Sequence, residues 1–274
     1  MPGMPGCSSE RKSSRKAPPS RSTSTGGMSV TPTSTIPGIP GHRRTISLSE
    51  RRAAPAGSSP AIAGTLPLSA LTFASCYIYA PRASGWLAAA SRELCERVKS
   101  SHPFWLPRYA GFVYRSSLRD RQLAELFAPN TVLVPVPGSA RSGAAPWAAF
   151  RLAVALSEVG FALRIWPGLR RQYSVTKSAT APSAARPTVH QHHDSFAVMR
   201  TTVAMRRIVL IDDVITKGRT LLAAAARLRG ELPYAEIRAF ALIRTQGFAQ
   251  HIEHLTERCH GVVRWTGCDA RREP

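Results

Sequence analysis

An apolar run that ends in two adjacent carboxylates is the feature that most constrains how this chain can fold. In the stretch RRIVLIDDVITKGRTL (206–221), Ile208–Ile211 leads directly into Asp212 and Asp213, and a short loop with a lysine, a glycine and two hydroxyls follows. Consecutive apolar residues predict a strand at 207–211 that is buried on both faces, as in parallel sheets. The paired acids then lie at its carboxyl end, where ligands of such sheets gather.

Strand and helix patterns alternate along the chain after residue 70. Short apolar segments separate stretches in which apolar residues recur at helical spacing. The extended segments are expected at 73–79, 131–137, 161–166, 207–211 and 236–244, and helices at about 84–100, 116–128, 144–159 and 219–229. Pro103 and Pro107 mark a linker, and 167–195 has an irregular, basic and polar pattern. This alternation predicts an α/β fold with a mainly parallel twisted sheet flanked by helices.

The loop after the paired acids has the groups needed to bind a sugar phosphate. A helix that begins near Arg219 leaves the backbone N–H groups of residues 216–220 unpaired at the positive end of the helix dipole. Gly218 allows a phosphate to approach closely, and Thr216 and Thr220 add hydroxyl donors. The two carboxylates offer acceptor oxygens to vicinal hydroxyls or to the water shell of a cation. Together these groups match the two ends of a ribose 5-phosphate.

Two segments resemble a known enzyme family. VLIDDVITKGRTL (209–221) is similar to the phosphoribosyl-pyrophosphate (PRPP) motif of type I phosphoribosyltransferases, although the family usually has a small residue at the position of Lys217. VLVPVPGSAR (132–141) resembles the family's first core strand and pyrophosphate loop, and its VPVP form is most like the ComF and amidophosphoribosyltransferase-like branch. The amino-terminal zinc ribbon of ComF proteins has no counterpart here, because the sequence has no paired cysteines.

The resemblance spans about residues 70–245 and implies a type I phosphoribosyltransferase fold with a small hood. The expected organisation is a disordered Ser/Pro/Arg-rich tail at 1–65 and a phosphoribosyltransferase-like domain at 66–274, made of a hood at about 70–130, a core at about 131–245 and a C-terminal tail at 246–274. In that tail, Cys259, Trp265 and Cys268 are expected to pack in a final strand or an extended end.

The resemblance also implies an activity. Such an enzyme binds PRPP and transfers the phosphoribosyl group to a nucleophile, usually a nitrogen, with release of pyrophosphate, and Mg²⁺ bridges the pyrophosphate and the ribose hydroxyls. No motif identifies the acceptor, and a homodimer stays open. The segment 167–195 stands where the family has a mobile loop that closes over PRPP. By position, Arg170, Lys177 and Arg186 are implied as pyrophosphate or loop contacts.

These correspondences define the predicted site. Asp212 and Asp213 would bind the ribose hydroxyls and, through substrate or water, the metal ion, with one of them helping as a base. Arg141, Lys177 and Arg186 would supply positive charge around the pyrophosphate, which completes the catalytic set. The PRPP-binding set comprises Asp212, Asp213, Val214, Ile215, Thr216, Lys217, Gly218, Arg219, Thr220, Ser139 and Ala140.

Two rival functions keep the same fold. The first is a non-catalytic PRPP-sensing regulator or accessory protein that binds nucleic acid. Residues 1–65 carry nine Lys/Arg and two acids, a net charge of +7, which leaves +14 for residues 66–274. That charge suits a polyanionic partner, but the sequence has no helix-turn-helix, zinc-finger or aromatic-interleaved basic signature. The second is a protein whose tail carries the activity and whose domain is vestigial.

His190, His192 and His193, in the stretch HQHHD, admit three interpretations. They could form a metal cluster, a polar loop near the substrate, or ordinary solvated positions. Their spacing matches no standard zinc pattern.

Composition bears on the cellular setting. The five cysteines form no C-x-x-C pair, which argues against a zinc ribbon or a disulfide framework and favours a reducing, cytoplasmic setting. No apolar run approaches the roughly 18 residues that span a bilayer, so we expect no membrane partner. Residues 1–65 have too few large apolar residues to form a core. They are expected to be disordered, with a transit peptide or a misassigned start, for example at Met28, as alternatives.

Overall fold

A computed structural model describes residues 66, 68–100, 102–140, 146–162, 164–176, 185–202 and 204–274. The expected tail at 1–65 and the predicted site residues Arg141 and Lys177 lie outside these described residues.

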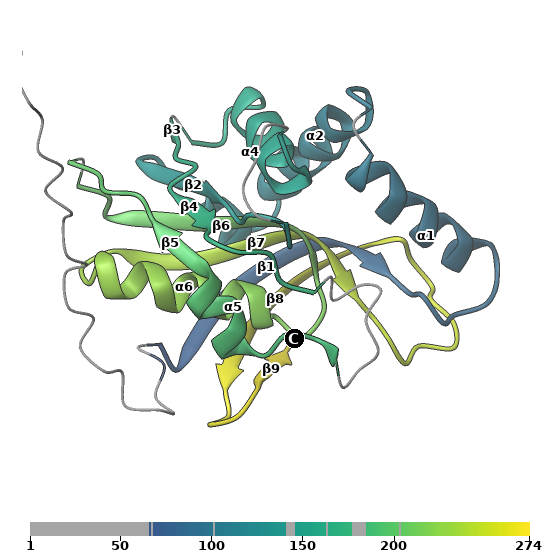
Figure 1. Cartoon of the computed structure of the whole chain (residues 1–274). Coiled ribbons are helices and arrows are strands. Elements are labelled where there is room, and N and C mark those ends of the chain that lie inside the picture. Colours follow the sequence, from purple (N-terminus) through teal and green to yellow (C-terminus); the bar gives the residue numbers. More distant parts are fainter. Residues whose placement is uncertain are drawn as a thin grey trace, which may run out of the picture. The chain divides into compact units, whose positions relative to one another are not determined.

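Seven strands form one sheet in the order β3-β2-β6-β7-β1-β8-β9 (Figure 1). They are β1 (Ala70–Tyr79), β2 (Thr131–Pro135), β3 (Arg164–Ile165), β6 (Arg207–Ile215), β7 (Glu236–Thr245), β8 (Thr256–Trp265) and β9 (Ala270–Glu273). Neighbours from β3 to β1 pair in parallel, and β8 and β9 add two antiparallel strands at one edge. The predicted α/β class with a mainly parallel sheet flanked by helices is therefore confirmed.

Helices cover both faces of this sheet. They are α1 (Trp86–Lys99), α2 (Trp105–Ser117), α3 (Arg121–Leu126), α4 (Ala148–Glu158), α5 (Val189–Ser195) and α6 (Arg219–Glu231). Figure 1 shows α1, α2 and α4 on one side and α5 and α6 on the other. Within the described part of the chain, no helix combines the length and apolar character needed to span a membrane.

The chain changes direction between two adjacent central strands, β2 and β6. From β2 it passes through α4 to β3 on one side, and from β6 it passes through α6 to β7 on the other. Val209 belongs to the buried cluster that includes α4, whereas its neighbour Leu210 belongs to the cluster that includes α6, so the two helices pack on opposite faces. In α/β sheets, such a reversal leaves a crevice at the carboxyl ends of the two strands, where ligands bind.

Two segments are more regular than the sequence indicated. The stretch 167–195, expected to be irregular, contains β4 (Leu169–Arg171) and the helix α5, and β4 pairs with β5 (Phe196–Val198) in a separate hairpin. The expected C-terminal tail forms β8 and β9, and β8 pairs directly with β1. Strand β1 falls within the range 70–130 that we assigned to a hood, but it pairs with β7 in the central sheet.

The prediction of a single helix at 116–128 was wrong. Instead α2 spans residues 105–117 and α3 spans residues 121–126. Pro107 is the third residue of α2, where a backbone N–H has no intrahelical partner, so the proline that suggested a linker is tolerated. Asp120 begins α3 by accepting a hydrogen bond from the N–H of Leu123 at 3.0 Å. The strand expected at 161–166 shortens to β3.

Gly261 in β8 tests whether the C-terminal strands are an integral part of the sheet. A Cβ at this position would overlap the carbonyl oxygen of Glu273 in β9 and lie 2.7 Å from the Phe73 ring in β1. We expect Gly261→Ala to lower the free energy of unfolding by about 1–3 kcal/mol, the usual cost of overpacking. Urea unfolding checks this, with Gly247→Ala as the control because a Cβ there has no neighbour within 4 Å. Equal stability of the two variants would contradict the close packing of β8 and β9.

Candidate functional site

The paired acids lie inside β6 rather than just after it. This strand continues to Ile215, beyond the expected end at residue 211, because its ladder with β7 extends from Asp212↔Ala241 to Ile215↔Arg244. Consecutive side chains of a strand point to opposite faces. The two positions therefore alternate along the strand, but their carboxyl groups stay close enough to interact through a side-chain hydrogen bond.

Asp212 interacts electrostatically with the buried guanidinium of Arg171 in β4. One of its carboxylate oxygens, Oδ1, accepts a hydrogen bond from the backbone N–H of Asp213 at 3.0 Å. Burial and the adjacent charge of Asp213 raise the pKa of Asp212 well above its ordinary value, and the charge of Arg171 opposes this shift only in part. Asp212 thus binds a proton more readily than an ordinary carboxylate.

Asp213 also interacts electrostatically with Lys99 in the last turn of α1. Its Oδ1 accepts a hydrogen bond from the N–H of Val214 at 3.0 Å. Burial alone would lower the pKa of Lys99, but the neighbouring Cys95 and Asp213 raise it. The last turn of α1 therefore brings a cation near the second carboxylate.

The loop between β6 and α6 places Gly218 directly before the helix. Gly218 caps α6 in the left-handed region, with φ of +81°, and a Cβ at this position would lie 2.5 Å from a methyl carbon of Val263 in β8. Both facts require glycine here. The helix begins at Arg219, so the first N–H groups of α6 have no intrahelical partners and face the end of the loop.

Most of the predicted PRPP-binding residues line one pocket of about 110 Å³ at this position. Its lining consists of Arg186, Asp212, Val214, Ile215, Thr216, Lys217, Gly218, Arg219, Thr220 and Leu221. The fold thus brings Arg186, which precedes α5 in the sequence, to the loop of α6. Asp213, Ser139 and Ala140 do not line this pocket.

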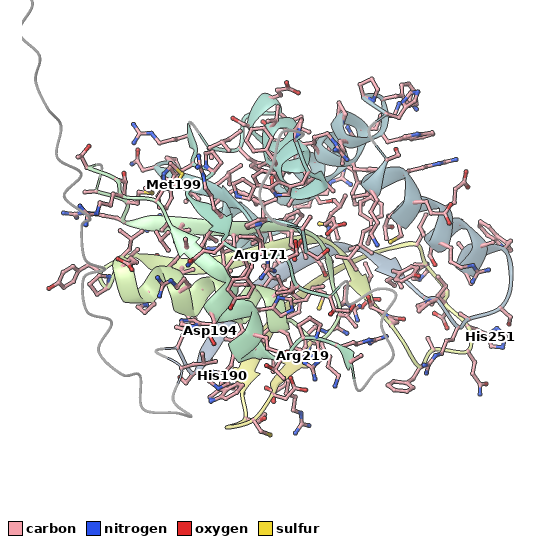
Figure 2. The ribbon with its side chains drawn as sticks, viewed as in Figure 1. Arg171, His190, Asp194, Met199, Arg219 and His251 are labelled. Atoms are coloured by element: carbon pink, nitrogen blue, oxygen red, sulfur yellow. The ribbon has the colours of Figure 1, made fainter. Side chains whose placement is uncertain are left out.

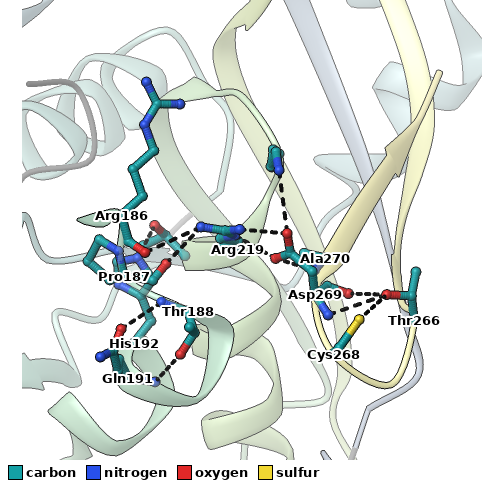
Figure 3. A network of polar contacts seen from close by, with 12 residues as sticks. Arg186, Pro187, Thr188, Gln191, His192, Arg219, Thr266, Cys268, Asp269 and Ala270 are labelled. Carbon is teal, nitrogen blue, oxygen red and sulfur yellow. Dashed lines mark hydrogen bonds and ion pairs between the residues drawn. The ribbon is translucent and has the colours of Figure 1, made fainter. Parts of the chain in front are cut away.

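Arg219, at the start of α6, forms hydrogen bonds with two other segments (Figure 3). Its Nε and Nη2 donate to the two carboxylate oxygens of Asp269, at 2.5 and 2.6 Å, and its Nη1 donates to the carbonyl oxygen of Pro187 at 3.2 Å. Lys217 also reaches Asp269, with 3.4 Å between Nζ and Oδ2. Asp269 lies in the turn between β8 and β9, and a bidentate contact of this kind fixes the geometry of both partners. These bonds give Arg219 a structural role at the edge of the pocket.

The carboxyl ends of β6 and β7 are tied together beside the loop. The hydroxyl oxygens of Thr216 and Thr245 lie 3.0 Å apart. Arg272 in β9 donates to the carbonyl oxygens of Ile215, at 3.0 Å, and Thr245, at 2.8 Å. The added C-terminal strands therefore support the site from one side.

Arg171 is a functional candidate that the sequence did not reveal, and His192 is one of the three histidines whose role the sequence left open. Each is only 3% exposed, and they contact each other between the β4–β5 hairpin and α6. Figure 2 labels Arg171 and Arg219, which come from β4 and from the start of α6. The sequence favoured Arg170, which is exposed because it points to the other face of β4.

The loop that contains Ser139 and Ala140 lies next to this buried pair. The indole N–H of Trp147 donates to the carbonyl oxygen of Val136 at 2.7 Å, and Arg171 Nε donates to that of Gly138 at 3.0 Å. The carbonyl oxygen of Ser139 accepts from the N–H of Val175 at 2.8 Å. The loop after β2 is therefore held at the same edge of the sheet as the paired acids.

The three histidines of HQHHD lie on α5 and have three different partners. His192 is buried against Arg171. His190 packs edge-on against Trp265, with ring centroids 5.2 Å apart, and His193 lies 3.1 Å from a carboxylate oxygen of Asp194. Among the residues described, no group of three or more His, Cys, Asp or Glu side chains could hold a metal ion.

Comparison of the chain with models of known protein families gives no match, and comparison with curated proteins gives none either.

The contact between Asp269 and Arg219 predicts a pH-dependent contribution to stability. Burial alone would raise the pKa of Asp269, but hydrogen bonds from Arg219 and the Ala270 N–H, with the charges of Arg219 and Lys217, lower it. A lowered pKa in the folded state adds stability above the unfolded pKa of about 3.9, and this is lost as the pH falls through the folded value.

At pH 7, Asp269→Asn should therefore lower the free energy of unfolding by about 1–2 kcal/mol. The difference from the wild type should shrink below about pH 4, where the wild-type carboxyl also becomes neutral. Urea unfolding at several pH values checks this. Glu273→Gln, which removes a more exposed partner of Arg264, is the control and should have a smaller effect. A pH-independent loss would contradict the assignment.

Proposed function

We propose that this protein binds PRPP and transfers its phosphoribosyl group to a nitrogen nucleophile with release of pyrophosphate, on a sheet that is the core of a type I phosphoribosyltransferase fold. One observation carries the proposal. The paired acids and the left-handed Gly218 loop lie together at the carboxyl end of β6, beside the point where the chain reverses direction between β2 and β6. Carboxylates for a diol and N–H groups for a phosphate are then held at the same edge of the sheet.

The proposed division of roles follows from the chemistry of each group. The N–H groups at the start of α6 and the hydroxyl of Thr220 bind the 5-phosphate, since they are donors at a positive helix end. Asp212 and Asp213 accept hydrogen bonds from the ribose hydroxyls. Holding the 5-phosphate and the two vicinal hydroxyls fixes the position of the anomeric carbon, so the sugar enters the reaction in one orientation.

The leaving group requires positive charge. Arg186 lines the same pocket as Asp212. Among the described residues, it is the only cation that we predicted as catalytic. The loop after β2, with Ser139 and Ala140, would face the pyrophosphate from the neighbouring strand. The barrier falls more when the site stabilises the charge that develops on the departing pyrophosphate than when it binds the ground state.

The residues fit a magnesium ion that is shared with the substrate. Asp212 and Asp213 supply the carboxylate oxygens that Mg²⁺ prefers, but no third acidic or imidazole side chain completes a site in the described part of the chain. When bound, Mg²⁺ would neutralise charge on the pyrophosphate. The protein's own contribution is to hold the two carboxylates toward the ribose hydroxyls.

Asp212 is the better of the two acids to act as a base. Burial and the charge of Asp213 raise its pKa, and proton transfer is most effective when the pKa of the catalytic group approaches the working pH. Asp212 would accept the proton that a nitrogen nucleophile releases as it bonds to the anomeric carbon.

Replacing the paired acids tests substrate binding. Asp212→Asn combined with Asp213→Asn should abolish PRPP binding measured by calorimetry with Mg²⁺ present, because the ribose hydroxyls lose both ionic acceptors. Asp194→Asn is the matched control, since its carboxyl is exposed on α5 and outside the pocket. Unchanged affinity in the double variant would exclude the proposed ribose site.

Turnover separates an enzyme from a PRPP sensor. A screen for PRPP-dependent pyrophosphate release over nucleobases, ammonia and small amides should give at least one acceptor that stimulates release well above the rate in water. The alternative, a nucleic-acid-binding regulator, predicts binding to duplex DNA or RNA that weakens steeply with salt. Binding without release would favour the sensor, and no nucleic-acid binding at low salt would eliminate it.

A further inference from the structure

A buried guanidinium joins the two loops of the proposed substrate site. Arg171 Nε donates to the carbonyl oxygen of Gly138 at 3.0 Å, in the loop after β2. Its Nη2 lies 3.0 Å from Nδ1 of His192, and its Nη1 contacts the hydroxyl of Ser195. The Arg171 guanidinium also stacks over the Phe196 ring at 3.9 Å. A charged group this deeply buried is costly unless its donors are used, so its position is strongly constrained.

The contact with Arg171 fixes the protonation of His192. A guanidinium can only donate hydrogen bonds, so Nδ1 of His192 must accept, and the neutral ring carries its proton on Nε2. Burial, together with the positive charges of Arg171 from β4 and Arg219 from α6, lowers the pKa of His192 to about 3. The Nε2–H points to the hydroxyl oxygen of Thr220, 3.4 Å away.

This arrangement determines what the hydroxyl of Thr220 can do. Its oxygen accepts from His192, so its own hydrogen is directed away from the imidazole. Thr220 lines the pocket at the start of α6, where an anion would be bound. The hydroxyl therefore donates its hydrogen to that anion, because its oxygen already accepts a hydrogen bond from His192.

We infer that Arg171 and His192 are positioning residues that orient the phosphate-binding Thr220 hydroxyl and hold it in register with the loop of Gly138. The inference rests on the proposed function, because the anion is taken to be the 5-phosphate of the substrate. Neither residue touches the substrate. Their effect is transmitted through one hydrogen bond to each loop, from Arg171 directly to Gly138 and through His192 to Thr220.

The first test is spectroscopic and needs no ligand. Nitrogen-15 NMR of the full chain should show the ring of His192 as the neutral Nε2–H tautomer at pH 7, with no change of charge down to pH 5. Comparison with the spectrum of His192→Gln assigns its signals. An Nδ1–H tautomer, or a charged ring at pH 6, would overturn the inference.

The second test is a double-mutant cycle on binding of ribose 5-phosphate, measured by calorimetry. Thr220→Val removes the oriented donor and should weaken binding about tenfold. His192→Phe should produce a similar loss, and adding it to Thr220→Val should have almost no further effect, because both changes remove the same interaction. Additive losses in the double variant would contradict the inference.

A matched neighbour provides the control. His193→Phe changes an adjacent histidine of α5 that does not contact Thr220 or Gly138 in the hydrogen bonds described, and it should bind ribose 5-phosphate like the wild type. His192→Gln should retain more affinity than His192→Phe, because an amide N–H can still donate to Thr220. Arg171→Met should weaken binding more than either. If it fails to fold, the cycle at His192 and Thr220 still decides the inference.

Failure of the inference and failure of the proposed function give different results. If the wild-type protein does not bind ribose 5-phosphate, the proposed function fails, and with it the role of these residues in substrate binding. If the wild type binds and His192→Phe binds equally well, the proposed function stands and the positioning role is wrong.

Discussion

The parallel pairing of β2 with β6 is the constraint on which the candidate site depends. Their register, from Thr131↔Arg207 to Pro135↔Ile211, ends the two strands at the same edge of the sheet. Because the crossovers from these strands pack on opposite faces, the loops that follow them separate and leave space between them. The proposed sites for the ribose, the 5-phosphate and the pyrophosphate all lie in that space. A shift of one residue in this register would exchange the faces of Asp212 and Asp213 and remove the site.

The charges around the site explain how a basic protein accommodates paired acids in its central strand. The charge of Asp212 is offset in part by Arg171, and Asp213 lies near Lys99. Arg219 is bound by Asp269 and by backbone carbonyl oxygens, so it holds the loop rather than competing for the anion. The arrangement divides the nearby cations between structural support and substrate binding. The net charge of +21 alone could not indicate this division.

The sequence predicted the elements that have strong local signals. The apolar run of β6, the helix α6 and the Gly218 loop follow from periodicity and turn chemistry, which act over a few residues. Arg171 was missed because β4 has only three residues, so nothing local decides whether it or Arg170 is buried. The capping box from Thr188 to Gln191 could have identified α5. Asp269 contacts Arg219 across fifty positions of sequence, and no local pattern encodes such a contact.

The most direct test of the account is a crystal structure of the protein with bound ribose 5-phosphate or PRPP. The account predicts that the phosphate contacts the backbone N–H groups of residues 216–220 and the hydroxyl of Thr220. It also predicts that the two vicinal hydroxyls of the ribose contact Asp212 and Asp213. A ligand bound elsewhere, or one bound in this pocket with its hydroxyls away from both carboxylates, would contradict the central claim.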